Sequence, residues 1–505
     1  MKKTEQFCRD IGTKISTKNA KAFTNLVISL SSYEQAGSVT GLSESPLFHH
    51  SYSSIRDGIT GVGGNEEEQV ASMSRLRELA LSQLELGGGD RVLLQTDASS
   101  IVKAHSSCLE DRQYVKINNN VISGNKPISV GYPISLVNIS PGVGKWSVPL
   151  DIRRINSHQS ATDCAVEQVK ELVQLDGLCD CLVLNTLDSG YGNASYMSRV
   201  YEEAHLVNLI RFRYGNKVWS RYEAGQASSI TKGASKKKGR PRVFGDQFYL
   251  IDRSDVKKYH RKGGAYEVER TSIFDLAHQE QVSLKATTYK GRALKIQLWR
   301  WNDLLIRTKK GHPMQDKPFD LVASRVSDAQ TGELVFQRTM FTLIHGHNKD
   351  QISTQEAFEG YRKRYDIEPA IKFAKQELLL DKYQTPCRQH FDNWLVVVMA
   401  AFWLLFTAKE VVKYRPKKWR QYKEAKIKQD KQMASELAPD LKPSQVKQAA
   451  QALFLTFDPK PFQPKASNKG RGRTKGTRMK PRSRYPVVKK GKDKNKIKLK
   501  IEKIE

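Results

Sequence analysis

The sequence predicts an α/β protein whose core is interrupted by a β-rich insertion. Apolar strand-like runs alternate with amphipathic helical segments through residues 89–214, which is typical of a sheet covered by helices. Residues 215–345 contain segments with the alternation of antiparallel strands, and helical segments return in residues 346–412. We therefore expect a two-part core with an inserted sheet. A helical region, residues 1–88, precedes the core, and a basic region, residues 413–505, follows it.

The first region has helical periodicity in two places. Residues 20–30 (AKAFTNLVISL) and 66–86 (EEEQVASMSRLRELALSQLEL) carry apolar side chains at the spacing of a helix face. A stretch rich in Ser and Gly separates them. We expect a small helical domain that binds DNA, although no helix-turn-helix signature is visible. A role in packing or dimerisation stays open.

Strands and helices are expected to alternate along the first part of the core. Residues 90–104 (DRVLLQTDASSIVKA) read as an apolar strand with Asp97 at or near its end. Residues 180–204 contain a buried strand, then Asp188 in a Gly-containing turn, then a helix. The other elements expected in this part are one or two strands in 127–139, an amphipathic helix in 161–175 and a strand in 205–213.

The charge balance indicates a polyanionic partner. The chain has 84 Lys and Arg against 53 Asp and Glu, a formal net charge of +31. That excess is larger than solubility needs, so we expect the protein to bind nucleic acid. A membrane partner is disfavoured, because we find no amphipathic anchor, lipidation motif or apolar signal-peptide core at the start. We therefore expect a cytoplasmic protein that binds nucleic acid.

Two further patterns receive a structural interpretation. The apolar run Trp394–Ala408 is 15 residues long, which is short for a bilayer span, and we expect a buried core helix. The pair His345 and His347 lacks partner ligands nearby, so a structural role or a solvated loop is favoured over a metal site. The six cysteines form no CxxC pair, and we expect reduced thiols.

The segment YRKRYDIEPAIKFAKQEL places Tyr361, Arg364, Glu368 and Lys375 at successive spacings of three, four and seven. On one α-helix these residues fall within roughly 60° of one face. A carboxylate beside two cations and a phenol suits a metal ion and the phosphates on which it acts. A solvated face with ion pairs is the alternative interpretation.

Pro369 complicates this helical face. Proline inside a helix removes a hydrogen bond and clashes with the carbonyl four residues earlier. The helix therefore either kinks there or begins near Glu368 with Pro369 in its first turn. In the second case Tyr361 and Arg364 lie outside the helix, whereas Glu368 and Lys375 remain two turns apart on it.

Three carboxylates are the candidate metal ligands. Asp97 follows VLLQT and Asp188 follows LVLNTL, so each leaves an apolar strand where it can face a cleft. Asp188 also precedes Ser-Gly-Tyr-Gly, and a simple turn role is the alternative there. Together with Glu368, these side chains form a set that can bind two Mg²⁺ ions about 3.5–4 Å apart for phosphoryl transfer. Mn²⁺ is expected to substitute.

The order Asp97, Asp188, Glu368 resembles the DDE triad of bacterial insertion-sequence transposases. The spacing Y-x2-R-x3-E-x6-K is similar to the Tyr-Arg-Glu-Lys signature of one cut-and-paste branch of them. The strand-rich interval before Glu368 and the segment TPCRQHFDNWLVVVMAAFWLLF after it also resemble that branch. The likeness covers roughly residues 89–410. It implies a ribonuclease-H-like fold interrupted by a β insertion.

The resemblance also implies roles for individual residues. Asp97, Asp188 and Glu368 would hold the catalytic metals, and Tyr361, Arg364 and Lys375 would hold phosphates near the transposon end. In this branch a flipped base often stacks on an aromatic side chain. Trp299 or Trp301 could do so here, although packing of the insertion is the favoured interpretation for both.

Two basic features are expected to add DNA affinity. The run Lys238-Gly-Arg240-Pro-Arg242 resembles the core of an AT-hook, with a merely basic surface loop as the alternative. Residues 466–505 hold 16 Lys or Arg against three acids, so this tail is expected to be largely disordered and to bind DNA without sequence preference.

These observations predict a metal-dependent DNA transposase that cuts and rejoins transposon ends in double-stranded DNA. A homodimer is expected, because two transposon ends must be brought together. Two alternatives stay open. One is a repurposed, inactive DNA-binding protein, and the other is a ribonuclease-H-like nuclease that hydrolyses DNA without joining strands.

Overall fold

A computed structural model describes most of the chain. The described residues are 1–16, 18–117, 128–142, 146–222, 243–261, 264–288, 291–308, 311–414, 441–457, 474, 476–478 and 481–488. The chain divides into two compact units. We call Met1–Leu86, Ala98–Cys164 and Asp366–Glu505 the helical unit, and Gly87–Asp97 and Ala165–Tyr365 the sheet unit. Strand β1 (Arg91–Val102) is shared, because its residues to Asp97 belong to the sheet unit and the rest to the helical unit.

The helical unit begins with the helices predicted for the first region. Asn65 caps the longest of these by accepting a hydrogen bond from the Glu68 amide at 2.8 Å, and three glutamates occupy the first turn. The elements are α1 (Lys2–Asp10), the π-helical turn η1 (Ile11–Ile15), α2 (Ala20–Ser32), the 3₁₀ turn η2 (Thr40–Glu44), α3 (Ser54–Thr60) and α4 (Glu66–Leu81).

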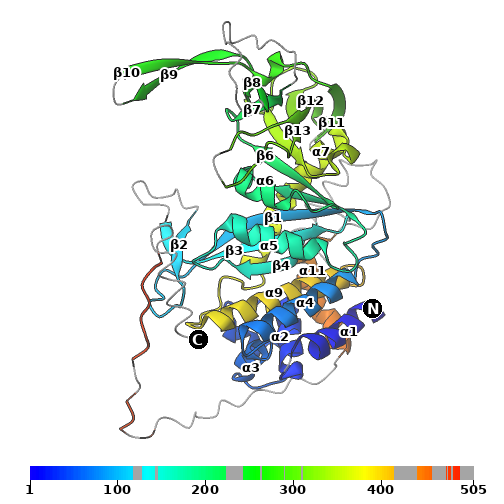
Figure 1. Cartoon of the computed structure of the whole chain (residues 1–505). Helices are drawn as coiled ribbons and strands as arrows, with labels where there is room; N and C mark the ends of the chain where they lie inside the picture. Colours follow the sequence, from blue (N-terminus) through cyan, green and yellow to red (C-terminus); the bar gives the residue numbers. More distant parts are fainter. Residues whose placement is uncertain are drawn as a thin grey trace. The chain divides into compact units, whose positions relative to one another are not determined.

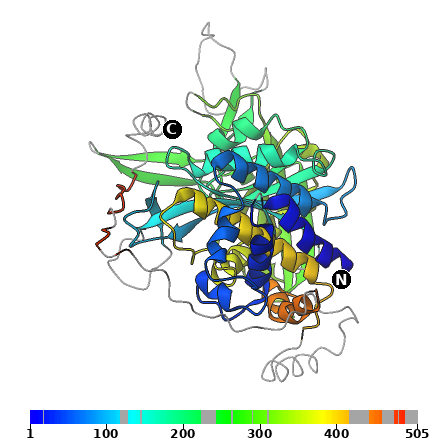
Figure 2. The same cartoon turned by 90° about the horizontal axis from the view of Figure 1, so that it is seen from below.

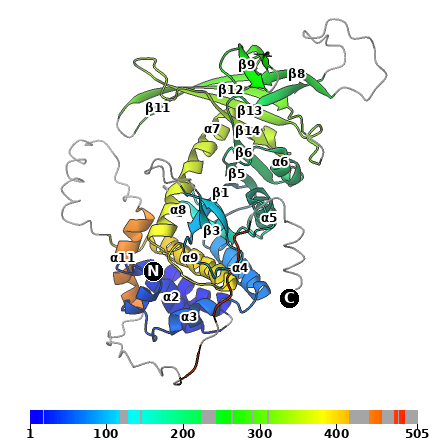
Figure 3. The same ribbon diagram turned by 90° about the vertical axis from the view of Figure 1, so that its left-hand side faces the viewer.

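The core of this unit is α9 (Arg388–Ala408), the apolar segment predicted to be a buried helix. By length and composition it passes as a membrane span, but 94% of its apolar window is buried inside the protein, which confirms the core assignment. Figure 2 shows the N-terminal helices beside α9, and α2 packs along it. A helix that the sequence reasoning did not predict, α11 (Pro443–Phe457), packs against α2 and α9 (Figure 3).

Antiparallel strands complete the helical unit. They are β2 (Gln113–Lys116), β3 (Ile128–Ser140) and β4 (Val148–Arg154), with β3 between the other two. A buried ion pair joins α4 to this sheet, because Arg77 lies 2.9 Å from Asp151 of β4 and both side chains are nearly inaccessible. Charges buried in this way are retained only when they are paired.

The sheet unit contains a mixed sheet in the order β11-β12-β13-β14-β6-β5-β1, which is drawn from blue (β1) to yellow-green in Figure 1. Strands β1, β5 (Leu182–Leu187) and β6 (Leu206–Phe212) run parallel, and the four other strands are antiparallel. This mixed α/β arrangement is compatible with a ribonuclease-H-like fold. The helices along this part of the chain are α5 (Ala161–Val173), α6 (Ala194–Val200) and α7 (Thr354–Arg362).

The region predicted to be a β-rich insertion is composed of strands. Four of them extend the main sheet: β11 (Glu280–Thr287), β12 (Ala293–Leu304), β13 (Phe319–Asp328) and β14 (Met340–His345). The others form two separate ribbons, β7 (Lys217–Arg221) with β8 (Phe244–Tyr249), and β9 (Asp255–Arg261) with β10 (Gly264–Arg270). Figure 1 shows the β9–β10 ribbon as an extended arm. Antiparallel pairing in this region was predicted and is confirmed.

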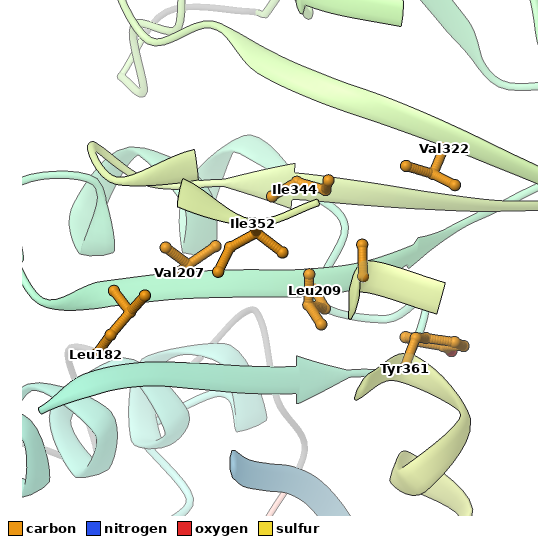
Figure 4. Close-up of a cluster of buried hydrophobic side chains, with 8 residues drawn as sticks. Leu182, Val207, Leu209, Val322, Ile344, Ile352 and Tyr361 are labelled. Atoms are coloured by element: carbon orange, nitrogen blue, oxygen red, sulfur yellow. The ribbon is translucent and has the colours of Figure 1, made fainter. Parts of the chain in front are cut away.

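A hydrophobic cluster fixes α7 on the sheet. Its fully buried members include Leu209 of β6, Ile344 of β14 and Tyr361 of α7, which are labelled in Figure 4. Burial of apolar area contributes about 25 cal/mol per Å², so such a cluster holds the helix firmly. The position of the segment that follows α7 is therefore restricted at its start.

The basic C-terminal region contains a short anchored segment. The amide of Tyr485 donates to the carbonyl of Ser107 at 3.1 Å, and the amide of Val488 donates to the carbonyl of Arg112 at 2.9 Å. Val488 also forms a parallel bridge with Gln113 of β2. The backbone groups of these two residues therefore pair with the chain beside β2, and the largely disordered state expected for the tail stays a prediction.

Candidate active site

Two of the predicted carboxylates lie at matching positions on neighbouring strands. Strands β1 and β5 are parallel, and their last paired residues are Thr96 and Leu187. Asp97 and Asp188 come next on each strand. Because adjacent strands lie about 4.8 Å apart, the backbones of both aspartates lie at the same edge of the strand pair. The prediction that Asp97 lies at or near the end of its strand needs correction, since β1 continues to Val102 and only its pairing with β5 ends, at Thr96.

The turn after β5 orients Asp188. Its Oδ1 accepts a hydrogen bond from the amide of Gly190 at 2.7 Å. A Cβ at Gly190 would lie 2.9 Å from the same Oδ1, so a larger residue there would displace the Asp188 carboxylate. The turn role considered from the sequence is thus present. It leaves Oδ2 of Asp188 for other partners, so it is compatible with metal binding.

A buried polar network lies beside the aspartates and was missed by sequence reasoning. Asn185 Oδ1 accepts from the Thr96 hydroxyl at 2.8 Å, and its Nδ2 donates to the Tyr196 hydroxyl at 3.0 Å. The Tyr196 hydroxyl in turn donates to Asn208 Oδ1 at 2.9 Å. These bonds join β1, β5, β6 and α6. The available signal was an asparagine in each of two apolar strands, LVLNTL and LVNLI.

The Tyr-Arg-Glu-Lys segment is broken into three pieces. Helix α7 ends at Arg362, a 3₁₀ turn (η5) covers Lys363–Asp366, and α8 (Ile367–Gln376) follows. Pro369 is the third residue of α8, where a missing amide hydrogen costs nothing. The single helical face predicted for all four residues is therefore wrong for Tyr361 and Arg364. The alternative that places the helix start near Glu368 is confirmed.

Contacts with β1 hold the turn before α8 in the sheet unit. Gln95 Nε2 donates to the carbonyl of Lys363 at 2.5 Å, and Arg91 pairs with Glu356 of α7. Arg364 Nη1 lies 3.9 Å from Asp97 Oδ2, and only 7% of the Arg364 side chain is exposed. The segment thus brings a buried guanidinium beside a candidate catalytic carboxylate.

Tyr361, whose ring lies near the Arg364 guanidinium, is fully buried. The Arg364 guanidinium carbon lies 6.0 Å from the centre of the Tyr361 ring. Burial raises the pKa of the Tyr361 hydroxyl to about 12, and the positive charges of Arg364 and Arg211 oppose this shift. Direct contact between Tyr361 and a DNA phosphate therefore needs a rearrangement. In the structure as it stands, the ring supports Arg364.

Glu368 and Lys375 share helix α8, as predicted. Glu368 is exposed in the first turn, where a carboxylate interacts favourably with the helix dipole. Lys375 Nζ donates to the Ser99 hydroxyl at 2.9 Å and to the Ser100 carbonyl at 2.8 Å, so it ties α8 to the second half of β1. Burial lowers the pKa of Lys375, and the Asp381 charge opposes this shift.

Carboxylate oxygens are the donors that Mg²⁺ prefers, and Asp97 and Asp188 supply them at one edge of the strand pair. This donor set fits a divalent metal. Glu368 belongs to the helical unit, whereas both aspartates belong to the sheet unit. Within the described ranges there is no group of three His, Cys, Asp or Glu side chains suited to hold a metal ion. Joint ligation by all three acids stays a prediction.

The other predicted residues fall into two groups. Lys238, Arg240 and Arg242 lie outside the described residues. Trp299 and Trp301 are 9% and 0% exposed, and the Trp301 indole donates to the carbonyl of Leu276 at 3.0 Å, so both pack the sheet as favoured.

His345 lies in β14 and is fully buried, which agrees with the structural role considered for it. Its ring packs against Tyr201, with the ring centres 5.3 Å apart. Burial lowers its pKa to about 3, with Lys317 and His347 adding to the shift. The neutral ring is thus the stable form at this position.

Comparison with protein families gives one match. The model of the DDE superfamily endonuclease family matches residues 11–280, a span that includes Asp97 and Asp188 and ends before Glu368. No curated protein is similar enough to this chain to count as a match. The family model covers more than half of the chain and includes the paired aspartates. This protein therefore belongs to the DDE superfamily endonuclease family.

Proposed function

We propose that this protein is a DNA transposase that cleaves transposon ends and joins them to target DNA. Family membership supports a transposase-type nuclease with DNA as substrate. The finer assignment, to the cut-and-paste branch with the Tyr-Arg-Glu-Lys signature, rests on the spacing of Tyr361, Arg364, Glu368 and Lys375. The net charge of +31 supports a polyanionic substrate.

The observation that carries the proposal is the register of β1 and β5. The pairing of the two strands ends at Thr96 and Leu187, directly before Asp97 and Asp188. Two Mg²⁺ ions held by these aspartates and Glu368, or Mn²⁺ in their place, would neutralise phosphate charge and activate the attacking oxygen. Carboxylates that share a site repel each other, and bound cations relieve this repulsion.

The surrounding cations have distinct roles in this proposal. Arg364 lies next to Asp97 and is placed to stabilise negative charge on the scissile phosphate. Lys375 acts as a positioning residue, because its ammonium group is already engaged by Ser99 and Ser100 of β1. The buried ring of Tyr361 packs near the Arg364 guanidinium and helps to position it. We further propose a homodimer in the complex that pairs two transposon ends.

The test uses duplex DNA that carries the sequences flanking the coding region. Asp97→Asn, Asp188→Asn and Glu368→Gln should each retain DNA binding and lose metal-dependent cleavage by on the order of 10²–10³-fold or more. Asp176→Asn and Glu359→Gln alter exposed carboxylates elsewhere and serve as matched controls. Cleavage by any of the three site variants at the parent rate would refute the assignment of that residue.

A pre-cut end separates the remaining candidates. A transposase joins the 3′-hydroxyl of that end to a second DNA molecule, whereas a nuclease of the same fold only hydrolyses DNA. A repurposed binding protein would hold both substrates without changing either. Strand-transfer products that disappear in Asp97→Asn would support the proposal, and their absence from the parent protein would overturn the joining step.

A further inference from the structure

A groove in the sheet unit lies directly beside the candidate active site. Its volume is about 870 Å³, near the upper end of the range of about 300–1,000 Å³ that is typical of ligand pockets. Strands β6, β11, β12, β13 and β14 and helix α7 line it. Its lining includes Ser189, which follows Asp188, and Tyr365, which follows Arg364. A ligand in the groove is thus next to both residues of the proposed site.

The charged side chains that line the groove are all positive. Four arginines line it, Arg211, Arg213, Arg338 and Arg362, and no carboxylate does. All four side chains are exposed, and none forms an ion pair with another described residue. Four cations without counter-charges repel one another, so the groove is complementary to an anion.

The remaining lining is apolar and partly aromatic. The side chains of Phe336, Tyr365 and Tyr214 are 63%, 46% and 37% exposed, whereas large aromatic residues are ordinarily more buried. The Arg338 guanidinium lies 5.3 Å from the centre of the Tyr214 ring, and Ile296 contributes to the apolar lining. The occupant should therefore present flat apolar faces together with negative charge.

Unpaired nucleotides meet both requirements. Sites for single-stranded DNA combine a basic groove that follows the phosphates with aromatic side chains on which bases stack. An intact duplex offers phosphates and base edges but no base faces, because the bases are stacked on one another. We propose that this groove binds a single-stranded stretch of DNA, more than one nucleotide long, next to the scissile phosphate. The inference rests on the proposed function, because it assigns the flanking strand of the same substrate.

The experiment compares the binding of two DNAs to the full chain, with the divalent metal chelated to prevent cleavage. One is a blunt duplex, and the other is the same duplex with a single-stranded extension of a few nucleotides. The extension should lower the Kd by about tenfold, since each stacked base contributes measurably. An extension of equal length that lacks bases should give little of this gain, because its phosphates alone cannot stack.

Variants then locate the effect. Phe336→Ala should remove most of the advantage of the extension and leave the blunt duplex unaffected. Arg338→Gln should reduce the salt dependence of binding to the extended DNA by about one counterion. Tyr266→Ala, an exposed aromatic on the β9–β10 ribbon, and Arg253→Gln, an exposed arginine outside the groove, are matched controls and should change neither.

Equal binding of the blunt and extended DNAs would overturn the inference. So would an equal gain from the extension without bases, or a gain that persists in Phe336→Ala. These outcomes are separable from failure of the proposed function. If the groove assignment fails alone, cleavage still depends on Asp97; if the proposed function fails alone, Asp97→Asn cuts normally while the preference for the extension remains.

Discussion

The guanidinium Nη1 of Arg364 lies 3.9 Å from the carboxylate Oδ2 of Asp97, and the arginine is almost fully buried. The pair connects the turn between α7 and α8 to the strand that carries a candidate metal ligand. A buried guanidinium keeps its charge and has a fixed orientation, so it is prepared for a phosphate before any DNA arrives. The surrounding contacts, rather than a shared helical face, bring these two residues together.

Arg364→Gln should reduce cleavage far more than DNA binding. Removing one preorganised donor typically costs on the order of 10²–10³-fold in rate, whereas a side chain that is 7% exposed adds little to DNA affinity. Single-turnover cleavage and anisotropy titration measure the two effects. Arg364→Lys should recover only part of the rate, since lysine lacks the planar fork. Equal losses of binding and rate would show that Arg364 acts mainly as a DNA anchor.

Lys375→Met should destabilise the protein by about 1–3 kcal/mol, because the hydroxyl of Ser99 and the carbonyl of Ser100 lose a charged donor. Urea unfolding measures this change. Lys372→Met alters an exposed lysine on the same helix and should be nearly neutral. If Lys375→Met keeps full stability and loses only DNA affinity, the ammonium group is a phosphate ligand instead.

Asn185→Leu should cost about 1–3 kcal/mol, because the buried Thr96 hydroxyl loses its acceptor and the Tyr196 hydroxyl loses one of its two partners. Tyr196→Phe removes the hydroxyl itself and should cost less. In the double variant the two losses should not add, since both residues belong to one network. Additive free energies of unfolding in a double-mutant cycle would contradict the coupling.

His345 should make the protein sensitive to acid. Its pKa in the folded state is held at about 3, whereas in the unfolded state it is near 6.5. As the pH falls below about 6.5, the His345 imidazole therefore becomes protonated in the unfolded chain but stays neutral in the folded protein. The free energy of unfolding decreases as a result. The loss should approach about 1.4 kcal/mol per pH unit. His345→Phe should lose less stability between neutral pH and pH 5, as measured by denaturant unfolding. Identical pH profiles for the variant and the parent would count against this explanation.

Periodicity was sufficient to predict the elements that form the core. The runs around Val92 and Val183 and the apolar helix around Trp394 appear as expected, because burial imposes a regular pattern on the sequence. The spacing of the Tyr-Arg-Glu-Lys residues was less informative about geometry. Pro369 favours a helix start, and contacts between distant residues such as Gln95 and Lys363 decide how the preceding turn lies.

Other features were not predictable from local sequence. The groove that Arg211 and Arg338 line depends on antiparallel registers between strands far apart in the chain, and these registers are not visible in any one segment. Helix α11 had a readable signal in PSQVKQAAQALFLTF, but the basic composition around it directed attention to disorder. Its buried Phe454 shows that a short amphipathic segment can contribute to a core.

The continuity of β1 restricts how this gene can vary. Asp97 and Ser99 are two residues apart in an extended strand, so their side chains emerge on the same side. Inserting or deleting one codon upstream of them within the strand would turn both to the opposite side while leaving the composition almost unchanged. Length variation among functional descendants should therefore accumulate in connecting loops and be absent from this strand.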